Sequence, residues 1–147
     1  MTMSENDAGG PLGAARHHRV KLRQAMAEVE GAAAGAAGDP TWRSDLALAL
    51  AELLSAFDGH VEEVDASDGL LAELVGLAPR LQNRVTRLGD EHPELRTMID
   101  SAIAIVDEGE VSEVRSQTMS VLGSLAAHRQ SGADLVYDAY NVDIGGE

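Results

Sequence analysis

The stretch LLSAFDGHVEEVDASDG, residues 53–69, contains the repeat on which the fold prediction depends. Leu53, Phe57 and His60 continue from Leu50 at steps of three and four residues, which is the spacing of one face of an α-helix. A histidine therefore occupies a position where the apolar face of an amphipathic helix should continue. A buried imidazole needs partners for both ring nitrogens. The fold must supply ordinary hydrogen bonds, or several such histidines must meet and hold a ligand.

Three other segments carry the same helical repeat of apolar residues, and turn signals separate the four. The turns are predicted at Gly38-Asp39-Pro40, where Asp39 or Thr41 can cap the next helix, at Gly76 with Pro79, and around Gly109. Ala and Leu favour helix, and no long alternating run is present. The sequence thus predicts an all-α protein, folded as an up-down-up-down antiparallel four-helix bundle. Its helices are expected at residues 14–36, 41–65 or longer, 79–107 and 110–140.

The length of 147 residues suits one domain, predicted at residues 14–140 between a disordered N-terminal segment, 1–13, and a C-terminal tail, 141–147. Two points within this domain stay open. The segment ASDGLLAELVGLAP, residues 66–79, either continues the second helix or forms a short helix of its own, started by Ser67 or Asp68. Pro93 either kinks the third helix or makes it restart after Gly89-Asp90.

Composition excludes several classes of function. A net charge of −14, from 11 basic and 25 acidic residues, argues against nucleic acid and anionic membranes as partners. The chain has no cysteine, which removes disulfides, thiolate catalysis and cysteine-ligated metal sites. Neither a phosphate-binding loop nor a serine-hydrolase motif is present. No signal peptide or membrane span is predicted, and the expected location is the cytoplasm.

Each predicted helix has one histidine in its apolar face: His18, His60, His92 and His128. The neighbouring His17 is out of phase with the apolar residues of the first helix and is expected to be solvated.

The positions of these histidines along the chain predict that they share one level. In antiparallel helices, residues equidistant from a turn lie at the same height. The midpoints between successive histidines are Asp39, Gly76 and Glu110, and each lies in or beside a predicted turn. All four imidazoles are therefore expected in one core layer. A metal cation would accept several of their lone pairs at once, and the alternative is a polar core layer that holds no metal.

Four segments together resemble the hemerythrin-like (HHE cation-binding) family. These are RHHRVKLRQAM at 16–26, LLSAFDGHVEEVDASDGLL at 53–71, VTRLGDEHPEL at 85–95 and LGSLAAHRQSGADLV at 122–136. The resemblance lies in their order, helix placement and histidine positions. It implies a bundle around a non-haem di-iron centre, in a protein that binds or senses oxygen or handles peroxide, nitric oxide or iron. The ligands that it implies are His18, His60, His92 and His128.

The chain departs from the family pattern at three ligand positions. Val64, Arg96 and Ala133 stand where the family motifs have Glu, His and Asp. Nearby carboxylates are Glu63, Asp65, Glu91 and Asp134, and Glu63 is the best placed, because residues three apart share a helix face. Asp65 and Asp134 are expected to be solvated. Three outcomes stay open: one metal held mostly by histidine, a di-iron site with shifted carboxylates, or a scaffold without metal.

Two hypotheses of different kinds follow for the function. The first is a metal-binding protein, with one or two non-haem iron ions or with zinc, that binds or senses oxygen or another small oxidant. The second is a metal-free helical scaffold that engages a protein partner or a second copy of itself. An open coordination position would also permit a mononuclear-metal enzyme, so the sequence leaves open whether the protein is an enzyme.

Overall fold

The protein is all-helical in the part that the structure, a computed structural model, describes, which is residues 10–65 and 69–145. This part contains five α-helices, one short 3₁₀ turn and no strand, and the all-α class is thereby confirmed. The elements are α2 (Gly10–Ala34), α3 (Trp42–Asp65), α4 (Leu70–Leu77), η1 (Pro79–Leu81), α5 (Gln82–Ile105) and α6 (Val111–Gly145). None of the described helices combines the length and the apolar character that crossing a membrane requires.

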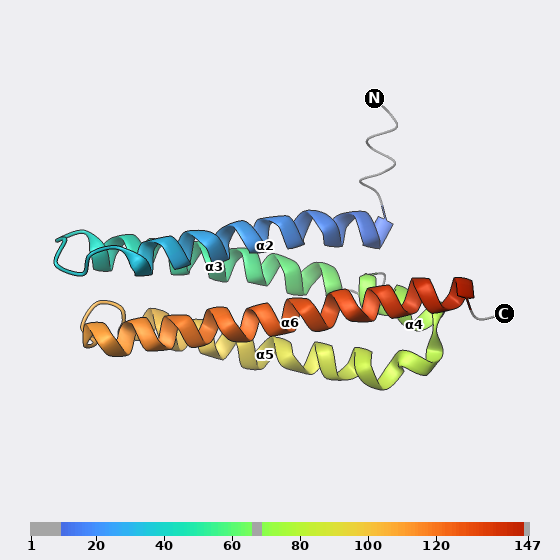
Figure 1. Ribbon diagram of the computed structural model, residues 1–147. Coiled ribbons are helices and arrows are strands. Elements are labelled where there is room, and N and C mark those ends of the chain that lie inside the picture. Colours follow the sequence, from blue (N-terminus) through green and yellow to red (C-terminus); the bar gives the residue numbers. More distant parts are fainter. Residues whose placement is uncertain (1–9, 66–68, 146–147) are drawn as a thin grey trace, which may run out of the picture.

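The four long helices run side by side (Figure 1). Helix α2 packs along α3, and α6 packs along α5; the two pairs meet where α3 contacts α5 and α2 contacts α6. The turns α2–α3 and α5–α6 lie at one end of the molecule, and α4 lies at the other (Figure 1). This arrangement brings the C-terminal part of α3 beside the middle of α5 and of α6.

Helix α4 is the main difference from the predicted four helices. Of the two alternatives for the segment after His60, the separate short helix is the one observed, and its N-cap residue is Gly69. The proposed starting residues Ser67 and Asp68 lie outside the described part. Leu70 and Leu74 are buried, and α4 contacts all four long helices. The apolar sequence LLAELVGL therefore folds over the end of the core, where its leucines leave water.

The helix ends also differ from the prediction. Helix α2 begins at Gly10, within the segment expected to be disordered, and α6 runs to Gly145, through most of the expected tail. Pro11 can lie in the first turn of α2 because a proline there sacrifices no intrahelical hydrogen bond. Residues 1–9 and 146–147 lie outside the described part.

Helix α5 is continuous through Pro93, so the helix does not restart after Gly89-Asp90. The helix is predicted to begin at residue 79, but Pro79–Leu81 form the separate 3₁₀ turn η1, and α5 begins after it. A proline inside a helix removes the hydrogen bond to the carbonyl four residues earlier, here that of Gly89. Packing of the buried residues around it, His92 and Leu95, holds this helix together.

The turn between α2 and α3 is fixed by side chains, as the sequence predicts. The backbone N–H and the hydroxyl of Thr41 both donate to Asp39 Oδ1, each at 2.9 Å. The backbone hydrogen bond, followed by the hydroxyl, lowers the pKa of Asp39. Trp42 Nε1 and Arg115 Nε both donate to the carbonyl of Ala33, which would otherwise be unpaired at the end of α2.

The core consists of two apolar clusters. The larger cluster fills the end with the two tight turns and includes Phe57, Leu95 and Leu125, whereas the smaller cluster lies under α4 and includes Leu88 and Leu135. On α5 and on α6, one buried histidine lies between the last residue of one cluster and the first of the other. A polar layer thus separates the two clusters.

Candidate metal centre

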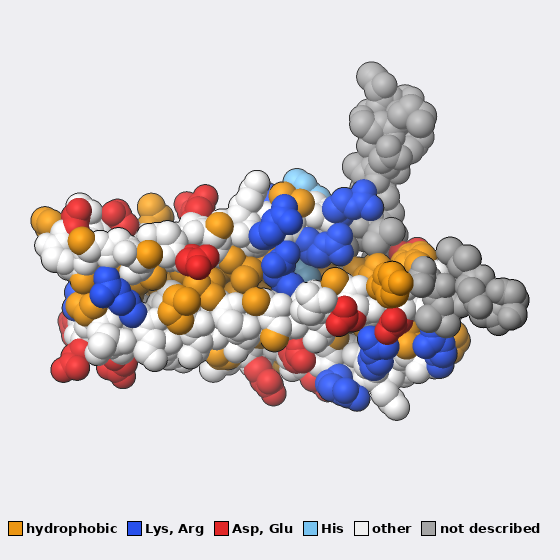
Figure 2. All heavy atoms as spheres, in the orientation of Figure 1, with side chains coloured by type: hydrophobic (Ala, Val, Ile, Leu, Met, Phe, Trp, Pro, Cys, Tyr) orange, Lys and Arg blue, Asp and Glu red, His pale blue; other side chains and the backbone are white. Residues whose placement is uncertain are grey.

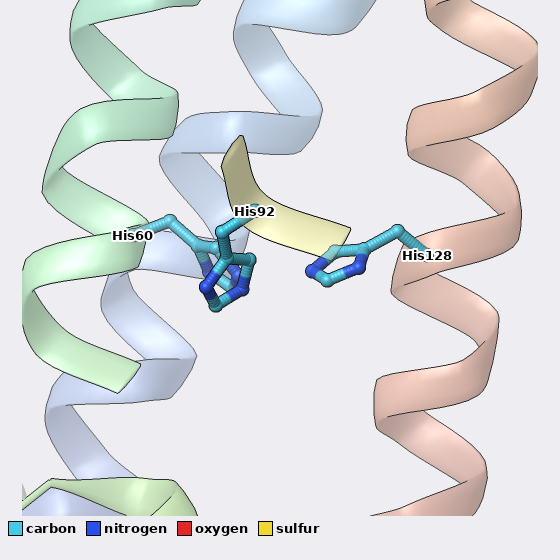
Figure 3. Close-up of side chains that lie close together, drawn as sticks. All are labelled: His60, His92 and His128. Atoms are coloured by element: carbon cyan, nitrogen blue, oxygen red, sulfur yellow. The ribbon is translucent and has the colours of Figure 1, made fainter. Parts of the chain in front are cut away.

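Three buried histidines from three helices form the polar layer. His60 comes from α3, His92 from α5 and His128 from α6, and their exposed fractions are 8%, 3% and 4%. Their ring centroids lie 5.5 Å apart for His60–His92, 5.7 Å for His60–His128 and 4.9 Å for His92–His128. Figure 3 shows the three rings converging on one another from separate helices. One ring nitrogen of each histidine belongs to a set whose members all lie within 4.8 Å of one another.

The spacing of these nitrogens fits one metal ion. Imidazole nitrogens bind zinc at about 2.0–2.1 Å, so two ligands of a tetrahedral ion are about 3.4 Å apart. Two ring nitrogens that are at most 4.8 Å apart must move roughly an ångström closer to reach this distance. Rotation about the side-chain bonds can supply that movement. The donor set is suitable as well, because three neutral imidazoles are good ligands for borderline transition metals.

His60 is suited to bind a metal ion. Both of its ring nitrogens are buried and have no hydrogen-bond partner among the described residues. Burial, followed by electrostatic repulsion from His92 and His128, lowers the pKa of His60 to about 3. The ring is therefore neutral at physiological pH and keeps a lone pair. A buried polar group left unpaired costs about 1–3 kcal/mol, which binding of a cation to that lone pair would offset in part.

His128 is oriented by a carboxylate. Its Nδ1 lies 2.6 Å from Glu91 Oε1, and the Glu91 side chain is 38% exposed while that of His128 is 3% exposed. Donation of the Nδ1 proton to this carboxylate places the lone pair of the neutral ring on Nε2. Metal-binding histidines commonly donate their second nitrogen in this way, which fixes the ring and raises its basicity. Glu91 therefore belongs to the candidate site as a positioning residue.

Sequence reasoning gave Glu91 no role in the site. In the sequence it is only a carboxylate beside His92, whereas the spacing from His60 favours Glu63. The predicted common height of His92 and His128 could have identified Glu91. Because the two histidines lie at one height, the residue next to His92 can reach the neighbouring helix.

Two of the predicted ligands lie outside the set of three histidines. The half-buried His18 lies against α3 at Gly59, where an added Cβ would be 3.3 Å from both Cε1 and Nδ1 of the ring. His18 thus borders a groove between α2 and α3, together with Lys21 and Glu28. Glu63 is half-buried on α3 and is likewise absent from the set. The structure brings together three of the four histidines and none of the expected carboxylates.

The three departures from the family pattern have separate consequences. Arg96 points outward, with Nε 3.2 Å from Asp58 Oδ1 and with both side chains about half exposed, so its charge is paired away from the core. Val64 is buried, 3% exposed, at the position where the resemblance implies a ligating carboxylate. Ala133 is exposed. Among the described residues, the set that could hold a metal therefore contains imidazoles alone.

A small cavity of about 40 Å³ lies beside the layer, on the side of α4. His60 and His128 line it, and so do two arginines, Arg19 and Arg129. The remaining lining is almost entirely apolar: Val64, Leu70, Leu71, Leu74, Leu88, Gly132, Ala133 and Val136. A cavity of this size has room for a water molecule or a ligand of two or three heavy atoms.

No family model, no curated protein and no solved structure matches the chain.

Proposed function

We propose that the protein is a hemerythrin-like metal-binding protein, in which His60, His92 and His128 hold one transition-metal ion. In this proposal α2, α3, α5 and α6 form an antiparallel up-down-up-down bundle, and α4 closes one end. The observation that carries the proposal is the set of three buried imidazoles, from three helices, with ring nitrogens within 4.8 Å of one another. A lone buried histidine is usually satisfied by its neighbours, whereas His60 has no hydrogen-bond partner among the described residues.

One ion is favoured over a pair of irons. The di-iron centre that the family resemblance implies needs carboxylates as bridges, and the set of potential ligands contains none. Glu91, the carboxylate in contact with His128, already pairs with that ring. Of the three outcomes left open by the sequence, the one-metal site held mostly by histidine therefore has the most support.

The donor set favours zinc, iron, copper or nickel over magnesium or calcium, which prefer oxygen ligands. Three protein ligands leave a further coordination position, at which the bound ion would act as a Lewis acid toward a small ligand. The cavity beside His60 and His128 is large enough for dioxygen or another small oxidant. In that role Glu91 orients His128, and burial keeps His60 neutral.

Metal content of the purified protein tests the proposal. The full chain is produced without a histidine tag, incubated with iron(II) or zinc(II), desalted, and analysed by elemental mass spectrometry. We expect one ion per chain in the wild type and in His17→Ala, which removes an exposed histidine, and a loss of the ion in His60→Leu. Circular dichroism establishes that each variant is folded. For the iron-loaded protein, a change in the absorption spectrum on exposure to oxygen tests the proposed ligand.

The metal-free alternative also has an observation in its favour. The histidine rings pack against one another and against Phe57, whose ring meets that of His92 at 6.0 Å and 81°. Such edge-to-face packing stabilises a ring layer without any ion. Protein that takes up neither iron nor zinc would refute the metal proposal and favour a helical scaffold with a protein partner. Two ions per chain would refute the one-metal site.

A further inference from the structure

Arginines gather at one place on this otherwise acidic protein. The arginine cluster consists of Arg16, Arg19 and Arg23 on α2 and Arg129 on α6. Figure 2 shows basic side chains collected over α2 and the facing part of α6, close to the histidine level. The chain has only 11 basic residues against 25 acidic ones, so a local group of four arginines runs against the overall charge. Like charges held this close repel one another, and a stable fold needs something to offset that repulsion.

The electrostatics of Arg19 illustrate the repulsion. Partial burial, followed by neighbouring positive charges, lowers the pKa of Arg19. The charges responsible are those of Arg16, Arg129 and Arg23, in that order. Arg19 and Arg129 are half-buried, whereas Arg16 and Arg23 are exposed. The half-buried pair is the one that water screens least.

The same two half-buried arginines line the cavity that reaches His60 and His128. Arg129 Nε is buried and has no hydrogen-bond partner among the described residues. Unpaired buried donors are rare in proteins, and those of a charged group are the most costly. None of the described Asp or Glu residues lines this cavity. The described part of the wall therefore offers positive charge and, at Arg129 Nε, a hydrogen-bond donor without an acceptor among the described residues.

We propose that this cavity binds a small monovalent anion, with the size and shape of formate, between Arg19 and Arg129. Its oxygens accept from the guanidinium groups, and the apolar leucine and valine walls disfavour an anion with a second charge, which would lose more hydration. Guanidinium is well suited to such a ligand, because its planar fork of donors matches two carboxylate oxygens. The inference goes beyond the proposed function, since the contacts that carry it require no metal. An anion bound here would also lie next to two of the proposed metal ligands.

Binding in the cavity predicts a dependence on the size of the anion that binding to arginines on the surface does not predict. Free arginines on a surface attract divalent anions more strongly than monovalent ones, because the attraction grows with charge. A cavity of about 40 Å³ has room for formate and is a poorer fit for the larger, divalent sulfate. Preference for formate over sulfate would thus distinguish binding in this cavity from general electrostatic attraction.

Isothermal titration calorimetry of the full chain, with its metal content recorded, tests the inference. Sodium formate and sodium sulfate are titrated separately, and ionic strength is held constant with sodium gluconate, whose anion is too large for the cavity. We expect saturable binding of formate at one site per chain and no saturable binding of sulfate. Arg129→Gln and Arg19→Gln should each weaken formate binding at least tenfold. Arg23→Gln, which removes the same charge from the cluster but not from the cavity wall, should weaken it less than threefold.

The variants are checked by circular dichroism, and Arg129→Lys, which keeps the charge, guards against a folding defect in Arg129→Gln. Partial retention of formate binding in Arg129→Lys supports the site. Sulfate binding as tight as formate binding, equal losses in Arg23→Gln and Arg129→Gln, or no saturable formate binding would each overturn the inference. The anion site and the proposed metal site can fail separately. A protein that takes up no metal but binds formate refutes only the metal site. A metal-loaded protein that does not bind formate refutes only the anion site.

Discussion

His60 should make the stability of the metal-free protein depend on pH, and the size of the effect follows from its burial. The unfolded chain protonates this histidine with a pKa of about 6.5, whereas burial lowers the pKa in the folded protein to about 3. Between these two values the unfolded state binds a proton that the folded state does not bind. The contribution of neutral His60 to the free energy of unfolding is therefore fully present above pH 6.5 and is lost as pH falls toward 3.

The magnitude can be worked out for a convenient pair of pH values. Between pH 7.5 and pH 5.0, a shift of this size lowers the free energy of unfolding by about 2 kcal/mol. For a chain of 147 residues, about 2 kcal/mol corresponds to a fall in Tm of roughly 4–8 °C. The fall due to His60 should be absent in His60→Leu, which replaces the imidazole with an apolar group of similar size.

Thermal unfolding of EDTA-treated protein, followed by circular dichroism at both pH values, measures the effect. Because other groups titrate in both proteins, the quantity of interest is the difference between the Tm changes of wild type and His60→Leu. His17→Leu, which removes an exposed histidine, serves as the matched control and should follow the wild type. Equal Tm changes in wild type and His60→Leu would mean that water reaches His60 in the folded protein, and the buried layer would then be refuted.

Three further substitutions test other parts of the structure. Glu91→Ala should weaken metal binding by about 10- to 100-fold, measured by competition with a chelator, because the imidazole that Glu91 orients becomes mobile; an unchanged affinity would contradict this role. Arg96→Leu should leave metal content unchanged and alter stability by no more than about 1 kcal/mol in urea unfolding, since it breaks only an exposed ion pair; a gain in bound metal would show that its charge acts on the core. Gly109→Ala should lower the free energy of unfolding by about 1–3 kcal/mol, because the new Cβ would lie 2.7 Å from the carbonyl oxygen of Ile105. The control Gly123→Ala has open space around it within α6 and should raise stability by about 0.5–1 kcal/mol, so equal effects would contradict the contact.

The helices and three of the site residues could be predicted from the sequence because both depend on local spacing. Apolar residues three and four apart define the buried face of a helix, and a histidine in that series is carried into the core with it. The distance of each histidine from a turn then determines its height. His60, His92 and His128 meet for this reason, and no knowledge of side-chain packing was needed.

His18 shows where such reasoning stops. Equal distance from a turn predicts height along the bundle, but not the direction in which a side chain leaves its helix. That direction depends on the surface of the neighbouring helix, and at this level α3 presents Gly59, which has no side chain to keep the ring of His18 away. The partner of His128 was missed for a related reason, because contacts between helices are not encoded in the spacing along either one.

Local signals do not decide how the segment of α4 folds. Its apolar sequence suits a separate helix started by Ser67 or Asp68 as well as a continuation of the preceding helix. The deciding factor is tertiary, since its leucines are buried only when the helix folds over the end of the core.

The division of the core into two unequal clusters has a consequence for dynamics. Among the described residues, the cluster under α4 contains eight buried residues and the other cluster eighteen. Regions with fewer buried contacts open at lower free energy than the whole domain unfolds. Local opening of the α4 end should therefore bring solvent to the imidazoles while the larger cluster stays folded. Amide protons of α4 and of the last turns of α6 would then exchange faster than those around Phe57, and an ion would enter and leave on the timescale of that opening.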